Sequence, residues 1–212
     1  LCFPTHVIMG KSIGEQGYEY GLAPEKQTVA VKMPVFSFEK IKGAEISLGP
    51  EMKSTGEVLG ISTDYDEAIY KAFIGSGINL PKKKNIICTI KDSAKDEFLP
   101  IAKQYYMFGY DLYATEGTYN FLKENNIPVN LVNRIDAKSN TMFDLMLTDT
   151  VDLVIDIPTR NNNLKDGFLI RRFAVEAGIP IFTSLDTAQA LITSLEKRHK
   201  GDTTLVDITR LK

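Results

Sequence analysis

Histidine and cysteine are the scarcest chemically versatile residues in this chain of 212 residues. The only two histidines, His6 and His199, lie close to opposite ends of the sequence. This placement argues against a Ser-His-Asp triad and against a zinc site built from several histidines. The two cysteines, Cys2 and Cys88, are too few for a disulfide framework. We therefore expect a reducing, cytoplasmic setting.

The chain also lacks an excess of either charge and any long apolar run. Its 25 Lys and Arg residues against 27 Asp and Glu residues give a net charge of −2, which argues against a nucleic-acid partner. No apolar run approaches the roughly 18 residues of a membrane span, so no membrane partner is expected. The chain starts at Leu1 and lacks the basic region of a signal peptide, which favours a fragment or a processed product.

A basic segment led by proline, Pro81-Lys82-Lys83-Lys84, predicts a linker between two units. Before it, residues 29–38 alternate as a strand does, and residues 58–61 form another short strand. Pro34 marks the first strand as an edge strand or an interrupted one. We therefore expect a small α+β unit over residues 1–80, a linker at 81–84 and a second domain at 85–212.

One helix of the first unit has a clear start. Asp64 stands where an N-cap residue belongs, and Glu67 follows three positions later, which is the spacing of a capping box.

After the linker, short apolar runs alternate with segments of helical period. The predicted strands are 85–90, 110–113, 129–132, 152–157 and 179–182, and the predicted helices are 94–108, 117–124, 141–147, 166–177 and 187–197. This alternation predicts an α/β fold, a three-layer sandwich with a parallel sheet.

Ligands of such folds bind beyond the carboxyl ends of the strands. Lys95 follows the first predicted strand, Thr115 and Thr118 begin the helix after the second, and Arg134 follows the third. Two cations, two hydroxyls and a helix N-terminus at one sheet edge predict a pocket for an anion of phosphate size.

Each of these residues also has a structural interpretation. A threonine at a helix start is commonly an N-cap, and a lone loop lysine or arginine is commonly solvated. Asn161, Asn162 and Asn163, in the loop after the fourth strand, suit a turn.

Specific strings indicate a family. The segments 9–17 and 48–58 resemble the large chain of carbamoyl-phosphate synthetases, and 49–58 resembles the end of its second ATP-grasp domain. From Asn85 onward the chain resembles the C-terminal regulatory domain of that family, with its methylglyoxal-synthase-like fold. The matching strings there are 114–118, 152–157 and 169–172.

This resemblance implies a parent enzyme that makes carbamoyl phosphate from bicarbonate, ammonia and ATP for arginine and pyrimidine synthesis. The implied cofactors are ATP and magnesium or manganese, and the implied partners are the rest of the large chain and a glutaminase small subunit. The metal ligands of the second ATP-grasp site belong to a Glu-Val-Asn-Pro string upstream of Leu1. The resemblance therefore implies no catalytic residue, metal or cofactor within these 212 residues.

The resemblance also implies two effector sites. Bacterial members hold a nucleoside monophosphate with residues that match Lys95, Thr115, Thr118 and Arg134, although the last is a lysine there. They bind ornithine at a second site, whose residues match Asp166 and Thr183.

Two departures from the family bear on these sites. Asp156-Ile157-Pro158 replaces an Asn-Thr-Thr string, so Asp156 either weakens anion binding or pairs with one of the pocket cations, Lys95 or Arg134. Met33 replaces the glutamate that the ATP-grasp domain contributes to the ornithine site.

Two other interpretations remain. An interface domain with an empty pocket would have the same composition. A stand-alone lyase of the methylglyoxal synthase type would need histidines near its substrate, and none lies between Val7 and Arg198.

Overall fold

The computed structural model describes residues 2–18, 21–22, 25–37, 52–78, 85–133, 141–148, 150–158, 164–199 and 203–210. The strands are β1 (Val29–Val35), β2 (Gly56–Ser62), β3 (Asn85–Ile90), β4 (Asp111–Ala114), β5 (Asn130–Leu131), β6 (Leu153–Ile157) and β7 (Ile181–Phe182). The α-helices are α1 (Cys2–Ile8), α2 (Tyr65–Gly75), α3 (Lys95–Met107), α4 (Glu116–Glu124), α5 (Met142–Leu147), α6 (Leu164–Glu176) and α7 (Leu185–His199). Short 3₁₀ turns are η1 (Gly14–Gln16), η3 (Asp92–Ala94) and η4 (Ile208–Arg210).

The part of the chain after residue 84 contains a parallel sheet of five strands in the order β5-β4-β3-β6-β7. The central strand β3 pairs in parallel with β4 on one side and with β6 on the other. The parallel arrangement predicted from the alternating strands and helices is therefore confirmed.

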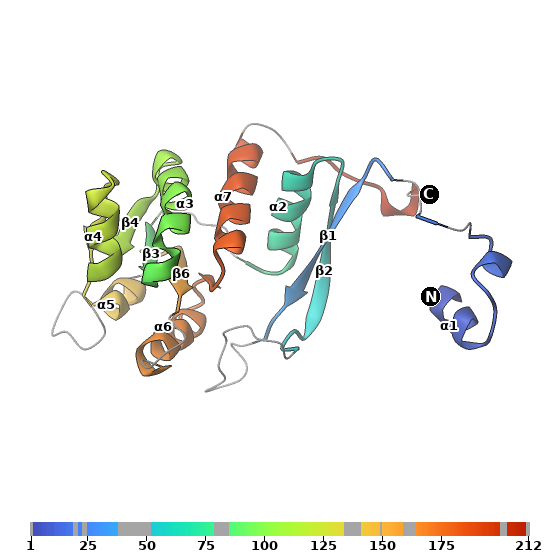
Figure 1. Ribbon diagram of the computed structural model, residues 1–212, viewed down its shortest axis with the longest axis horizontal. Helices are drawn as coiled ribbons and strands as arrows, with labels where there is room; N and C mark the ends of the chain where they lie inside the picture. The colour runs from blue at the N-terminus through green and yellow to red at the C-terminus, as the bar shows by residue number, and fades with distance from the viewer. Residues whose placement is uncertain are drawn as a thin grey trace.

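Helices cover both faces of this sheet. Ile86, Cys88 and Ile90 of β3 pack into the core beneath α3, α4 and α7, whereas Ile87 packs into a second core beneath α5 and α6. This division follows from the period of two in a strand, which sends successive side chains to opposite faces. The three-layer α/β fold is confirmed (Figure 1).

The first unit contains an antiparallel ribbon of β1 and β2, on which α2 packs. Pro34 lies in this ribbon opposite Glu57, and among the described residues its strand pairs with β2 alone, which fits the edge alternative. Gly60 of β2 permits the close approach of the helix, because a Cβ atom at this position would lie 2.0 Å from the Ala68 carbonyl oxygen. The linker at 81–84 lies outside the described residues, and the boundary there stays a prediction.

The two units share one core. Ile69 and Phe73 of α2 belong to the same buried cluster as Leu191 of α7, and the Phe73 and Phe182 ring centroids lie 5.8 Å apart. Figure 1 shows α4, α3, α7 and α2 in a row, with α7 between α3 and α2. An ion pair of 2.8 Å between Lys197 Nζ and Asp64 Oδ2 also spans this junction.

Glu67, in the first turn of α2, connects three parts of the chain. Its carboxylate accepts hydrogen bonds from Ser62 Oγ at 2.7 Å and from Thr204 Oγ1 at 2.8 Å, and pairs with Lys71 Nζ at 3.1 Å. Burial raises the pKa of this carboxyl, but the hydrogen bonds from Ser62, Thr204 and Lys71 outweigh burial and lower the pKa from 4.5 to about 2. Asp64 caps the helix as predicted, since it accepts the Glu67 N–H at 3.0 Å.

This carboxylate is expected to make the stability depend on pH. A pKa that folding lowers contributes stability above about pH 4.5, and the contribution is lost as the pH falls toward 2. The difference corresponds to at most about 3 kcal/mol of unfolding free energy. Urea unfolding should show that the free energy of unfolding of the wild type exceeds that of Glu67→Gln near neutral pH and that the two values converge in acid. The control variant Glu97→Gln should have the free energy of unfolding of the wild type at every pH. A difference that persists in acid would contradict this role of Glu67.

Among the described residues, no helix is long and apolar enough to cross a membrane.

Candidate functional site

The order of the strands creates a switch point at the carboxyl edge of the sheet. The chain proceeds outward from β3 through β4 to β5, and then returns to β6 on the other side of β3. The segment after β3 leads to α3 on one face of the sheet, whereas the segment after β6 leads to α6 on the other. Where such connections diverge, parallel α/β sheets have a crevice suited to a ligand.

Lys95 lies beside this edge, at the first position of α3. Its Nζ donates to the Gly117 carbonyl oxygen at 2.7 Å and pairs with Asp92 Oδ1 at 2.7 Å. The ammonium also lies 6.0 Å from the centroid of the Phe121 ring. Only 13% of the Lys95 side chain is exposed. The ammonium is thus fixed against the first turn of α4, which begins at the end of the neighbouring strand.

Thr115 and Thr118 occupy that same first turn. Thr115 is the N-cap residue of α4, yet its side chain makes no capping hydrogen bond. Because the first N–H groups of a helix have no partner within the helix, this end can accept an anion. Thr118 is 2% exposed, and its Oγ1 accepts the Ile90 N–H at 3.1 Å. The hydroxyl of Thr118 therefore connects α4 to the end of β3, a contact that no sequence signal predicted.

The structure describes three of the four residues expected in the anion pocket and places Lys95 against the turn of α4 that contains the other two, of which the buried Thr118 hydroxyl is bonded to the Ile90 backbone. Lys95 contacts Gly117, which lies between Thr115 and Thr118 in the sequence. The fourth, Arg134, lies outside the described residues. Asp92, which the sequence analysis did not select, is in direct contact with the ammonium. The spacing of three residues between Asp92 and Lys95 was the sequence feature that could have predicted this ion pair.

Asp156 pairs with Arg171, a cation that the sequence analysis did not name, whereas Lys95 or Arg134 was the expected partner. Its Oδ2 lies 2.9 Å from Nη1 of Arg171 on α6, and both side chains are about 95% buried. Asp156 pairs with this arginine because its neighbours Ile155 and Ile157 face the α3 side of the sheet, which directs Asp156 to the α6 side. A Cβ atom at Gly167 would lie 2.9 Å from Arg171 Nη1, so this glycine leaves room for the guanidinium.

The two residues of the expected ornithine site lie on neighbouring connections. Asp166 lies in the first turn of α6, although its side chain is outside those described, and Thr183 directly follows β7. Both positions are at the carboxyl edge, since β6 and β7 are parallel neighbours. Met33 packs against the core, so no carboxylate stands there. Ornithine binding stays a prediction.

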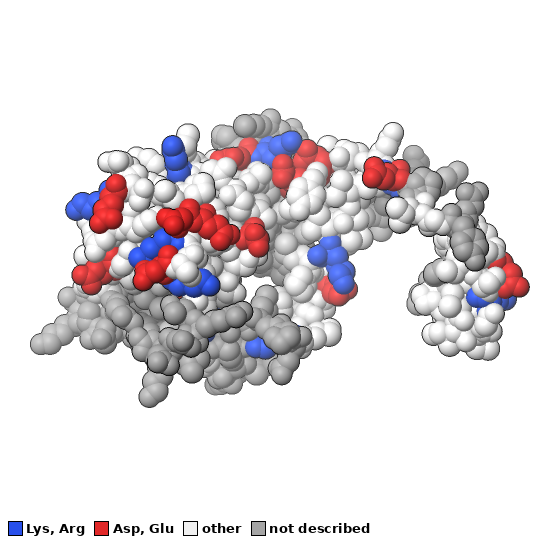
Figure 2. Space-filling model, viewed as in Figure 1, with Lys and Arg blue, Asp and Glu red and all other residues white. Residues whose placement is uncertain are grey.

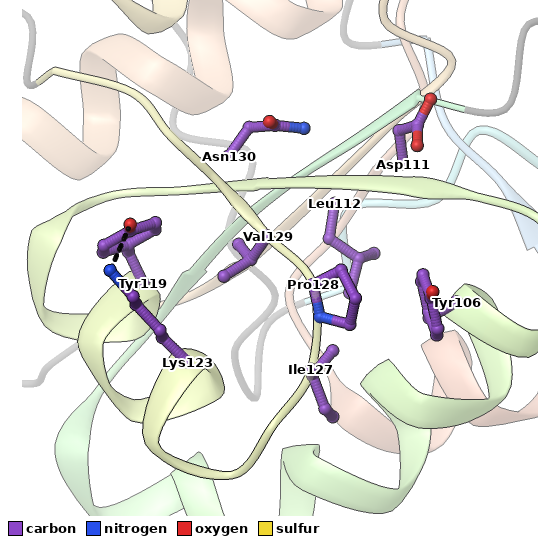
Figure 3. Close-up of a pocket in the computed structure, with 9 residues that line it drawn as sticks. All are labelled: Tyr106, Asp111, Leu112, Tyr119, Lys123, Ile127, Pro128, Val129 and Asn130. Carbon is purple, nitrogen blue, oxygen red and sulfur yellow. Dashed lines mark hydrogen bonds between the residues drawn. The ribbon is translucent and has the colours of Figure 1, made fainter.

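A groove of about 390 Å³ lies away from these residues, between α3, α4 and the segment that enters β5. Its lining residues are Tyr106, Asp111, Leu112, Tyr119, Lys123, Ile127, Pro128, Val129 and Asn130 (Figure 3). Asp111 and Asn130 begin their strands, so this groove reaches the amino edge of the sheet. Lys123 Nζ is hydrogen-bonded to the Tyr119 hydroxyl at 3.2 Å.

Charge does not collect into one large patch on the face shown in Figure 2. Acidic and basic side chains lie next to one another there, over α3 and α4. Among the described residues, no three His, Cys, Asp or Glu side chains gather as a metal ion would require.

The MGS-like domain family matches residues 97–183, a range that contains Thr115, Thr118, Arg134, Asp166 and Thr183. Among solved structures, methylglyoxal synthase from Elizabethkingia anophelis matches with 18% identity and a TM-score of 0.43. The match covers 54% of this chain and 80% of that protein.

Curated relatives match along nearly the whole sequence. The carbamoyl phosphate synthase large chain of Lachnoclostridium phytofermentans is 49% identical over 208 residues, and that of Agathobacter rectalis is 50% identical over 210 residues. Each match covers 98% of this chain and 20% of the relative. The large chain of Clostridium botulinum is 44% identical over 201 residues, which are 94% of this chain and 19% of the relative. The chain thus spans about a fifth of the length of these relatives.

Proposed function

We propose that this chain, which is homologous to carbamoyl phosphate synthase large chains along 98% of its length, contains the site at which a phosphate-bearing effector regulates such an enzyme. The site consists of Lys95, Thr115, Thr118 and Arg134. In this proposal the chain regulates catalysis and does not carry it out. The wider protein would be a cytoplasmic ligase that uses ATP and magnesium or manganese, with a glutaminase subunit as its partner.

One observation carries the proposal. The Lys95 ammonium contacts the first turn of α4, where the Thr115 hydroxyl makes no capping hydrogen bond. A fixed cation, a hydroxyl donor and the N-terminus of a helix together form a favourable environment for a phosphate group. The position beside the switch point of the sheet supports the same conclusion.

A second candidate function is an interface domain that binds no effector. The observation in its favour is that the Lys95 ammonium is already paired with Asp92 and with the Gly117 carbonyl oxygen. The two candidates differ in one measurable property, the affinity for phosphate-bearing ligands.

Isothermal titration calorimetry with nucleoside monophosphates and ornithine tests the proposal. At least one phosphate ligand is expected to bind with a Kd between micromolar and millimolar values. Lys95→Met should weaken this binding about tenfold or more, because it removes a charge-assisted hydrogen bond. Arg134→Ala should cost about 1–3 kcal/mol of binding for the same reason.

The matched control is Lys103→Met, which removes an exposed lysine from the same helix. It should leave the affinity unchanged, and all variants should retain the helical signal of the wild type. Equal affinity of the Lys95 and Lys103 variants would contradict the assignment of the site. Failure of every phosphate ligand to bind would favour the interface function.

A further inference from the structure

The acidic partner of Lys95 is unusually exposed for a residue that holds a buried cation. The Asp92 side chain is 95% exposed, whereas that of Lys95 is 13% exposed. A lysine ammonium has three N–H donors, of which Asp92 and the Gly117 carbonyl take two. An anion that approaches from solvent therefore meets an ammonium whose outward partner is a carboxylate.

We propose that Asp92 is an internal competitor for the anion site, which occupies the Lys95 ammonium in the free chain and leaves it when a ligand binds. This inference rests on the proposed function and adds the element that sets the affinity of the site. Asp92 thereby lowers the affinity of the site for every anion, and a phosphate dianion, which can make further contacts, still binds more tightly than a simple monocarboxylate.

Local backbone geometry imposes this pairing. Asp92 begins the 3₁₀ turn η3, and Lys95 is its C-cap residue, whose N–H is bonded to the Asp92 carbonyl. In a 3₁₀ turn the side chains at positions i and i+3 lie one above the other. The carboxylate is therefore held at the ammonium by the same turn that positions Lys95. The pKa of Asp92 is lowered by the hydrogen bond and the charge of Lys95, which agrees with this pairing.

Tethering gives Asp92 an advantage over dissolved carboxylates. Its effective concentration at the ammonium is set by a three-residue spacing, and for short connections such values reach the millimolar range or above. A monocarboxylate offers Lys95 the same charge without this advantage. A phosphate dianion carries more charge, and its further oxygens can accept hydrogen bonds from Thr115 and from the first N–H groups of α4.

The decisive comparison is between Asp92→Asn and Asp96→Asn. Both variants remove one negative charge within three residues of Lys95, but the ion pair is made by Asp92. Calorimetry with inorganic phosphate and with acetate is expected to show that Asp92→Asn tightens both by the same factor, about two- to fivefold, as the modest strength of exposed ion pairs indicates. Asp96→Asn should change both affinities much less.

Two results would overturn the inference. If Asp92→Asn weakens phosphate binding, Asp92 positions the ammonium instead of competing for it. If the two variants tighten binding equally, the affinity depends on the net negative charge near the site and not on the ion pair of Asp92. In both cases a loss of phosphate binding in Lys95→Met would leave the proposed function intact. If phosphate does not bind at all, or if Lys95→Met binds it as tightly as wild type does, the proposed function fails as well.

A measurement without any ligand provides an independent check. Hydrogen exchange of the Lys95 ammonium, followed by ¹⁵N NMR of the full chain, should be slow in wild type and in Asp96→Asn. It should accelerate in Asp92→Asn, since the outward partner is gone. Unchanged exchange in Asp92→Asn would show that the ion pair does not persist in solution, and the inference would fail.

Discussion

Replacing Asp156 by alanine is expected to lower the free energy of unfolding by about 3–5 kcal/mol. The substitution removes the carboxylate that lies 2.9 Å from Arg171, and it leaves a guanidinium whose side chain is 5% exposed. Removing one member of a buried ion pair is costly because the remaining charge has lost water and this opposing carboxylate. Chemical denaturation measured by circular dichroism would give the value.

Two further variants separate the lost ion pair from lost packing. Asp156→Asn keeps an oxygen acceptor for Arg171 and should therefore cost less than alanine. Combining Asp156→Leu with Arg171→Met should restore much of the stability, since apolar pairs of similar volume often replace buried ion pairs without loss. A cost below about 1 kcal/mol for the alanine variant would contradict a stabilising pair.

Phe73→Ala is expected to lower the free energy of unfolding by a similar amount, about 3–5 kcal/mol. Phe73 is 1% exposed and packs with Phe182 and the α7 side of the shared core, so its removal leaves a cavity at the junction of the two units. The neighbouring residue of α2, Ile74, is 50% exposed. Ile74→Ala should therefore cost much less and serves as the matched control.

Hydrogen exchange should locate the effect of Phe73→Ala. Amides of α2 and α7 are expected to lose protection together, because the two helices share one core. Loss of protection in α2 alone would mean that the first unit unfolds separately from the second. Equal costs of the Phe73 and Ile74 variants would contradict the packing at this junction.

The parallel sheet could be predicted from the sequence because its strands are short apolar runs between segments of helical period. The same regularity placed Lys95 next to Thr115 and Thr118, since parallel strands bring their carboxyl ends to one edge. Element bounds differed by a few residues at most, as for the strand expected at 110–113 and observed at Asp111–Ala114. Such differences are usual where helices and strands fray.

Contacts between distant segments could not be predicted in this way. Thr204 contacts Glu67 across 137 positions of the sequence, and no periodicity carries that information. The pairing of Asp156 with Arg171 could not be predicted either. It depends on the face of the sheet to which the Asp156 side chain points and on the space that Gly167 leaves for the guanidinium. The role of Asp92 depended on a single 3₁₀ turn inside a segment expected to be a loop before a helix.

Amide chemical-shift mapping of the full chain with the phosphate ligand that binds most tightly would locate the anion site. The largest shifts are expected at residues 92–95 and 115–118, around the Lys95 ammonium and the first turn of α4. Shifts concentrated instead at the groove of Tyr106, Tyr119 and Lys123, with residues 92–95 unchanged, would contradict this location of the site.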